Sequence, residues 1–170
     1  MNDQELRAVQ APLKDRYRTD PESARKTLRV QGMLDLERIA CRIETGRGAV
    51  TEAGLHPMAG GNRSFACSAD MLLEALIGCA GVTLCAVATA MTIPITAGTI
   101  AAEGDVDFRG TLGVSKDVPI GFMAIRLIIE LQTTADDAVL EKLAKLTERY
   151  CVVAQSLSEA ARPSVIIRRV

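Results

Sequence analysis

A long run without charge constrains this 170-residue chain more than any other feature of its sequence. The 28 residues from Ala75 to Ala102 include no Asp, Glu, Lys or Arg, and they begin with the stretch ALIGCAGVTLCAVATAM. About 20 apolar residues suffice for a helix to cross a membrane, so the run is long enough for one. It also suits a helix buried in the core of a soluble protein.

Three features of the run favour the buried helix. Pro94 lies inside it, and a proline within a helix ends or kinks that helix. Five threonines reduce its hydrophobicity, namely Thr83, Thr89, Thr92, Thr96 and Thr99. No cluster of Lys or Arg stands at either end to set a membrane topology. We therefore expect no membrane span, but a buried helix that ends before Pro94 and is followed by a strand.

Composition limits the compartment and the partners. Hydrophobic residues make up 48% of the chain and aromatic residues only 3%, so Ala, Leu, Ile and Val must build the core, and dimerisation could complete it. The net charge of -1 provides no basic face for nucleic acid. The first 25 residues are polar and charged, unlike a signal peptide, which indicates the cytoplasm. In that reducing compartment the five cysteines are expected to be free, catalytic or metal-bound.

Hydrophobic patterns on both sides of the run predict an α+β fold. We expect residues 1–26 to form an N-terminal extension and residues 27–170 a single domain. Strands are expected at 27–34, 38–45, 49–54, 98–110, 121–134 and 164–170, and the fourth and fifth should pair as a hairpin. Helices are expected at 69–91, capped by Ser68 or Asp70, at 133–150, capped by a threonine, and at 151–161.

Four of the cysteines resemble small buried hydrophobic residues when each is taken alone. Cys79 and Cys85 are six residues apart, about 120° around an ideal helix, so they cannot form a disulfide with each other or easily share a metal. Cys41 falls in a strand and Cys67 in a loop. The chain has no Cys-x-x-Cys motif and a single histidine, His56, so we expect no metal site. A Cys–His hydrolase would need His56 beside a cysteine, and nothing in the sequence places it there.

Cys151 stands out because of its position. It follows LTERY directly and is expected to begin a new helix. Free amide groups at a helix N-terminus stabilise a thiolate and lower the thiol pKa. The sequence therefore predicts that Cys151 is partly ionised.

Two blocks of sequence resemble the OsmC/Ohr family, the osmotically induced and organic-hydroperoxide-resistance proteins. The first is SADMLLEALIGCAGVTL, where Cys79 matches a family cysteine in a long central helix. The second is LTERYCVVAQSL, where Cys151 matches a cysteine that opens a later helix. The pattern Tyr-Cys-x-Val-Ala-x-x-Leu is most similar to the OsmC-like branch. The order of strands and helices also matches, so the resemblance covers residues 27–170.

The resemblance implies both an assembly and an activity. In the family, β-sheets wrap around long central helices in an intertwined homodimer, with active sites at the subunit interface. Cys79 would attack an organic hydroperoxide and become a sulfenic acid, and Cys151 would resolve it to a disulfide. A cellular dithiol of the lipoyl or thioredoxin type would then reduce the disulfide. No metal or other cofactor is implied.

The sequence departs from the family pattern around the first cysteine. Well-characterised members activate that cysteine with an arginine from the N-terminal strands and a glutamate ten residues before it, where this chain has Ala69. Asp70 and Glu74 fall on other faces of an ideal helix. The candidate arginines are Arg25, Arg29, Arg38, Arg42 and Arg47. The alternative function is therefore an OsmC-like dimer that binds a small apolar or thiol ligand with little or no catalysis.

Overall fold

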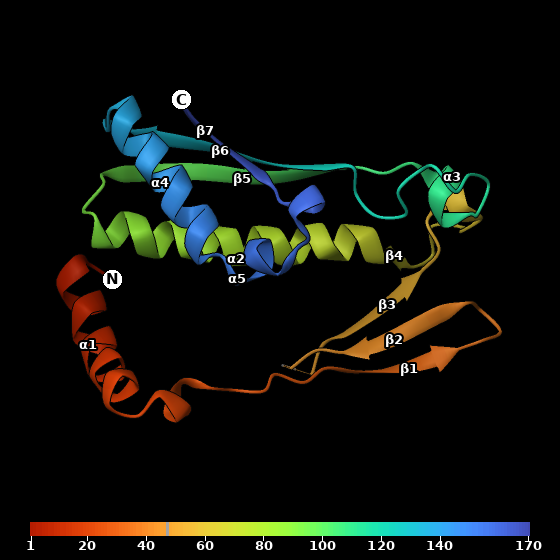
Figure 1. Ribbon diagram of the computed structural model, residues 1–170, viewed down its shortest axis with the longest axis horizontal. Helices are drawn as coiled ribbons and strands as arrows, with labels where there is room; N and C mark the ends of the chain where they lie inside the picture. The colour runs from red at the N-terminus through yellow and green to blue at the C-terminus, as the bar shows by residue number, and fades with distance from the viewer. Residues whose placement is uncertain (47) are drawn as a thin grey trace.

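The fold is α+β, as predicted, and contains two sheets (Figure 1). The computed structural model describes residues 1–46 and 48–170. The first sheet has the order β1 (Gln31–Asp35), β2 (Ala40–Glu44), β3 (Val50–Gly54) and β4 (Ala66–Cys67). The second has the order β5 (Ile95–Asp105), β6 (Ala124–Thr133) and β7 (Ser164–Arg169). The helices are α1 (Asp3–Thr19), α2 (Ser68–Ala90), α3 (Phe108–Thr111), α4 (Asp137–Tyr150) and α5 (Val152–Ser156), and short 3-10 turns cover Pro21–Ala24, Pro57–Ala59 and Glu159–Ala161.

The core lies between α2 and the second sheet. Leu76, Ala80, Leu84 and Ala88 recur every four residues along α2 and are buried, as expected for one face of a helix. On β6, alternate residues are buried, namely Ile125, Leu127, Ile129 and Leu131. Each such Leu or Ile side chain contributes about 1.5–3 kcal/mol when it leaves water. The uncharged run therefore supplies the helix around which the sheet and α4 are packed.

The prediction that the helix ends before Pro94 is confirmed. α2 ends at Ala90, Thr92 has a positive φ of 54°, and β5 begins at Ile95. Within the part of the chain that is described, α2 is the one helix long and apolar enough to cross a membrane. It packs instead against α4, α5 and β5, which is the setting of a core helix.

Two helix caps differ from the expectation. The N-cap of α2 is Cys67, not Ser68 or Asp70, and its side chain makes no capping hydrogen bond. The N-cap of α4 is Asp136 rather than a threonine, and its carboxylate accepts a hydrogen bond of 2.8 Å from the Val139 amide. An aspartate caps well because its charge also favours the positive end of the helix dipole.

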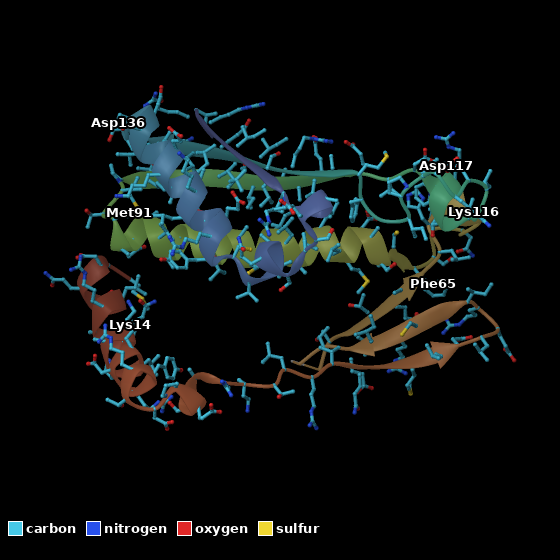
Figure 2. All side chains as sticks on the ribbon, in the orientation of Figure 1. Lys14, Phe65, Met91, Lys116, Asp117 and Asp136 are labelled. Atoms are coloured by element: carbon cyan, nitrogen blue, oxygen red, sulfur yellow. The ribbon has the colours of Figure 1, made fainter. Side chains whose placement is uncertain are left out.

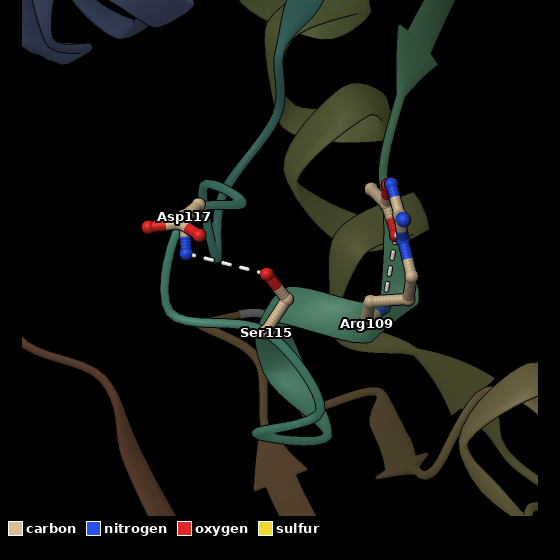
Figure 3. A network of polar contacts seen from close by, with 4 residues as sticks. Arg109, Ser115 and Asp117 are labelled. Carbon is tan, nitrogen blue, oxygen red and sulfur yellow. Dashed lines mark hydrogen bonds and ion pairs between the residues drawn. The ribbon is translucent and has the colours of Figure 1, made fainter.

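The expected pairing of β5 with β6 as a hairpin is confirmed, and the connection between these two strands is long. The two strands do pair antiparallel, with Ile100 opposite Ile129, but residues 106–123 between them fold into a separate excursion that contains α3. Local polar contacts hold this excursion (Figure 3): Arg109 pairs with Asp107, and the Ser115 hydroxyl accepts a 3.3 Å hydrogen bond from the Asp117 amide. Such contacts satisfy backbone groups that no strand partner reaches.

The first sheet projects away from α2, and β4 connects it to the rest of the chain (Figure 1). In its register Leu34 lies opposite Cys41, and Cys41 lies opposite Ala53, so these residues share one apolar face. That face is only partly covered, since Leu34 is 79% exposed. Large apolar side chains are therefore left in contact with water around this sheet.

Candidate functional site

The structure brings Cys79 and Cys151 together. Cys79 lies in the middle of α2, and Cys151 is the residue at which α4 ends and α5 begins. Ala80 and Ala154 are both fully buried in the same core cluster, and their small side chains let the two helices approach closely. As a result Cys79 packs against the core cluster that contains Cys151, and the Cys151 thiol lowers the pKa of Cys79. Cys79 is partly buried and Cys151 is only 1% exposed.

Hydrogen-bond donors favour the thiolate form of Cys79. Burial by itself raises the pKa of the Cys79 thiol, but the donors around its sulfur lower that pKa by more than burial raises it. In decreasing order of effect these donors are the Val153 amide, the Cys151 thiol, the Val152 amide and the Thr83 hydroxyl. Cys79 is therefore the cysteine of the pair that ionises first.

Cys151 behaves in the opposite way, which corrects the expectation that it is partly ionised. Burial raises the pKa of the Cys151 thiol, and the hydrogen bond to Cys79 and the negative charge there raise it further. The Ala154 amide donates to the Cys151 sulfur at 3.5 Å and offsets only part of this rise. The Val153 amide also lowers the pKa of Cys151 slightly, but the amides of Val152 and Val153 both lower the pKa of Cys79, on another helix.

No charged side chain contributes to the pKa of Cys79 among the described residues. Arg38 forms ion pairs with Asp35 and Glu52, at 2.6 Å and 2.9 Å, and its guanidinium lies 5.1 Å from the centre of the Phe65 ring. Phe65 lies between the first sheet and the start of α2 (Figure 2). Arg25 pairs with Glu22. The candidate Arg47 lies outside the described residues.

The remaining cysteines lie elsewhere. Cys85 is exposed and lines an apolar cavity of about 300 Å³ between α2 and β5. Cys67 lines a second cavity, of about 310 Å³, together with His56, a proximity that sequence reasoning missed. The His56 ring stacks on Phe108 at 4.7 Å, and its Nδ1 accepts a hydrogen bond from the Met58 amide. Since that nitrogen is occupied, it is not available to take a proton from Cys67. Within residues 1–46 and 48–170, no group of three potential ligand side chains could hold a metal ion.

Comparison with known proteins assigns this chain to one family. A family model described as OsmC-like protein matches residues 61–165. A sequence comparison with curated proteins finds no match.

Solved structures share the fold. The OsmC-like protein from Mycoplasma pneumoniae superposes with a TM-score of 0.68 at 16% identity, covering 85% of this chain and 98% of that one. An organic hydroperoxide resistance protein from Elizabethkingia anophelis gives a TM-score of 0.69 at 11% identity, covering 86% and 99%. The organic hydroperoxide resistance protein OhrB of Bacillus subtilis gives 0.62 at 15% identity, covering 84% and 98%. With the family model spanning more than half of its length, the chain belongs to the OsmC-like protein family.

Proposed function

We propose that this protein is a thiol-dependent peroxidase that reduces organic hydroperoxides with Cys79 and Cys151. The observation that carries the proposal is the contact between these two thiols, in which one is set to be ionised and the other to keep its proton. A nucleophile and a proton donor are the two groups that cleavage of a peroxide bond requires.

In the first step the Cys79 thiolate attacks the terminal oxygen of the hydroperoxide. A sulfur–oxygen bond forms, the oxygen–oxygen bond breaks, Cys79 becomes a sulfenic acid, and the remainder of the substrate leaves as an alkoxide. The Cys151 thiol is the proton source next to the reacting sulfur. Its proton converts the alkoxide into an alcohol and leaves Cys151 as a thiolate.

In the second step the new Cys151 thiolate attacks the Cys79 sulfur. A disulfide forms and hydroxide leaves, which takes a proton to become water. A dithiol of the lipoyl or thioredoxin type then transfers two electrons and two protons, which restores both thiols and converts the reductant into a disulfide. A resolving thiol in direct contact also limits oxidation of Cys79 to sulfinic acid.

The surroundings of the pair favour an apolar substrate. Val82 lies one turn beyond Cys79 on α2 and is 72% exposed, and Val152, next to Cys151, is equally exposed. Such side chains bind the hydrocarbon part of an organic hydroperoxide better than they bind hydrogen peroxide. The solved structures of organic hydroperoxide resistance proteins that share this fold support the same substrate class.

We propose a homodimer in the cytoplasm, in which residues 27–170 form the family domain. The support is the apolar surface that one chain leaves uncovered, which is larger than a soluble monomer usually exposes. Its members around the first sheet are Leu28, Val30, Met33, Leu34, Leu36 and Ile39. Val82 extends this surface onto α2.

The test of function is to treat the reduced protein with one equivalent of cumene hydroperoxide and map its cysteines by mass spectrometry. A disulfide between Cys79 and Cys151 is the expected product. Cys151→Ser should trap sulfenic or sulfinic acid at Cys79, and Cys79→Ser should abolish peroxide consumption. Cys85→Ser is the matched control and should react like the parent protein, because Cys85 is exposed on another face of α2.

A ligand-binding role is the second candidate, because Ala69 stands where the family has its glutamate and the thiolate is stabilised without a cation in the single chain. In that case a small apolar or thiol ligand would bind beside Cys79 with little turnover. The same experiment separates the two functions. If no cysteine oxidises at one equivalent of peroxide, the ligand-binding function is the better one.

A further inference from the structure

A cavity of about 310 Å³ lies at the N-terminal end of α2 and is here called the His56 cavity after one of its lining residues. Three segments that are far apart in the sequence form its walls: residues 54–59 around the end of β3, residues 67–72 at the start of α2, and residues 106–122 of the excursion between β5 and β6 (Figure 1). The residues that line it include neither Cys79 nor Cys151. The His56 cavity is therefore separate from the candidate site.

The walls of the His56 cavity are mainly apolar and partly aromatic. The Phe108 ring stacks on the His56 ring, with 4.7 Å between the ring centres and 22° between the planes, and Phe122 packs against the core cluster at the middle of α2. Ile120 is 71% exposed, so the cavity opens to solvent on its side. The apolar lining side chains are Leu55, Leu72, Val106, Phe108, Ile120 and Phe122. A concave site of this size with such walls is typical of small-molecule binding.

The charge of the lining residues limits the class of ligand. None of them is Asp, Glu, Lys or Arg. A charged ligand would therefore leave water for apolar walls without a charged partner, which is strongly unfavourable. Flat aromatic walls instead favour an aromatic ring, which gains from offset or edge-to-face packing beyond the burial of its surface. The cavity therefore suits a neutral aromatic molecule.

His56 supplies an oriented polar group in this apolar wall. Its Nδ1 accepts a hydrogen bond of 3.1 Å from the Met58 amide. A neutral imidazole that accepts at one nitrogen carries its proton on the other, so Nε2 is the donor of this ring. We propose that the His56 cavity binds a small neutral aromatic carbonyl compound, whose oxygen accepts a hydrogen bond from His56 Nε2. This inference goes beyond the proposed peroxidase function and does not rest on it.

The test is a titration of the full chain, labelled at the isoleucine δ1 methyl groups, followed by methyl NMR. Acetophenone is the probe, and ethylbenzene is its match in shape without the oxygen. Acetophenone should shift the Ile120 methyl signal saturably, and ethylbenzene should bind there about fivefold more weakly because it accepts no hydrogen bond. Four isoleucines line the other cavity, between α2 and β5, and their signals provide the internal reference, namely Ile93, Ile95, Ile100 and Ile129.

Two variants separate the donor from the shape of the cavity. His56→Phe keeps a ring against Phe108 and removes the donor, so acetophenone should bind it about as weakly as ethylbenzene binds the parent protein. Thr111→Val is the matched control, because it removes another polar side chain from the cavity wall and should keep the preference for acetophenone. Binding of ethylbenzene to His56→Phe with the parent affinity would show that the cavity is intact in that variant.

Several results would overturn the inference. An Ile120 signal that acetophenone does not shift saturably excludes the site, and equal shifts of the reference isoleucines at the same probe concentration mean partition into any apolar space. Equal affinity of the parent protein for the two probes excludes the hydrogen bond, even if His56→Phe does not fold. An undiminished preference for acetophenone in His56→Phe excludes His56 as the donor. Binding is measured without peroxide, so failure of the peroxidase proposal is detected separately.

Discussion

At the scale of single residues, the site depends on where a few hydrogen-bond donors point. The amides of Val152 and Val153 open α5, the helix that Cys151 caps, yet they donate to the sulfur of Cys79. At Cys151, burial and the neighbouring negative charge raise the pKa by more than the Ala154 and Val153 amides lower it, so this thiol stays protonated. A donor that lowers the pKa of one thiol thus sets the roles of both, because the ionised sulfur raises the pKa of its neighbour.

The pair should produce a bell-shaped pH dependence of peroxide consumption. The pKa of Cys79 is lowered, so the rate should rise with pH at values below the ordinary thiol pKa of about 8.5. The pKa of Cys151 is raised, so the rate should fall again only above that value, when the proton donor is lost. Initial rates with cumene hydroperoxide across pH 5 to 10 measure both limbs.

The variant Cys151→Ala provides the control for this profile. It removes the thiol that donates to Cys79 but keeps the amides at the start of α5. The pH at which the rate of Cys79 alkylation begins to rise should then be higher than in the parent protein. If the rate in the parent protein rises only at or above the ordinary thiol pKa, Cys79 is not the cysteine that ionises first.

The sequence predicted which two cysteines form the candidate site, but it did not predict which of them loses its proton first. The family resemblance pointed to Cys79 and Cys151, whereas helical periodicity alone left Cys79 as a small buried residue. The low pKa was assigned to Cys151 because sequence reasoning links amides only to their chain neighbours. The contact between α5 and α2 is a tertiary feature, and no pattern within either helix encodes it.

At the scale of elements, the prediction was right for the central helix but wrong for the end of the strand expected at 98–110, because β5 ends at Asp105 and Phe108–Thr111 form α3. α2 and β2 lie within a residue or two of their expected bounds. β4 has only two residues, which is too short to show an alternating pattern, and it exists because Gly54 and Cys67 meet across the first sheet. The helix α3 in the excursion between β5 and β6 was not predicted, because its four residues are too few to show helical periodicity. β1 begins at Gln31, later than the expected 27.

The uncapped start of α2 offers one test at this scale. Cys67 is the N-cap, and its side chain makes no capping bond. Serine accepts a hydrogen bond from the N2 or N3 amide, so Cys67→Ser should raise the free energy of unfolding by about 0.5–1 kcal/mol. Urea denaturation measures the change. Cys41→Ser is the control, because it makes the same chemical change on a strand and should bring no gain; equal stabilisation of both variants would contradict the capping explanation.

The excursion of residues 106–123 depends on a glycine at its tightest point. A side chain at Gly110 would place its Cβ 2.4 Å from the Pro119 carbonyl oxygen, and Gly110 is buried. Gly110→Ala should therefore lower the free energy of unfolding by about 1–3 kcal/mol, since backbone must move to make room. In Gly121→Ala, within the same excursion, the Cβ would meet nothing within 4 Å, and stability should hardly change. Thermal unfolding compares the stability of the two variants, and an equal loss of stability in both would rule out the steric explanation.

At the scale of the whole molecule, one chain does not cover its own apolar surface. The first sheet projects from the rest of the structure (Figure 1). α2 packs on β5 of the second sheet, yet Val82 on α2 is largely exposed. A second copy of the chain could cover both, because a two-fold dimer presents the same surface twice. The core built from Ala, Leu and Ile, with few aromatic residues, is consistent with a fold that is completed by association.

The last prediction concerns this association and compares two valines of almost equal exposure. Val82 on α2 is 72% exposed and Val114 in the excursion after α3 is 71% exposed, so a glutamate at either position would cost little in an isolated chain. If a second copy covers α2, Val82→Glu buries an unpaired charge at the interface, which is strongly unfavourable. Light scattering at micromolar concentration should therefore show a dimer for the parent protein and for Val114→Glu, and a monomer or a weaker dimer for Val82→Glu. If Val82→Glu leaves the dimer unaffected, the interface does not include this part of α2. If the parent protein is a monomer, the proposed dimer is wrong.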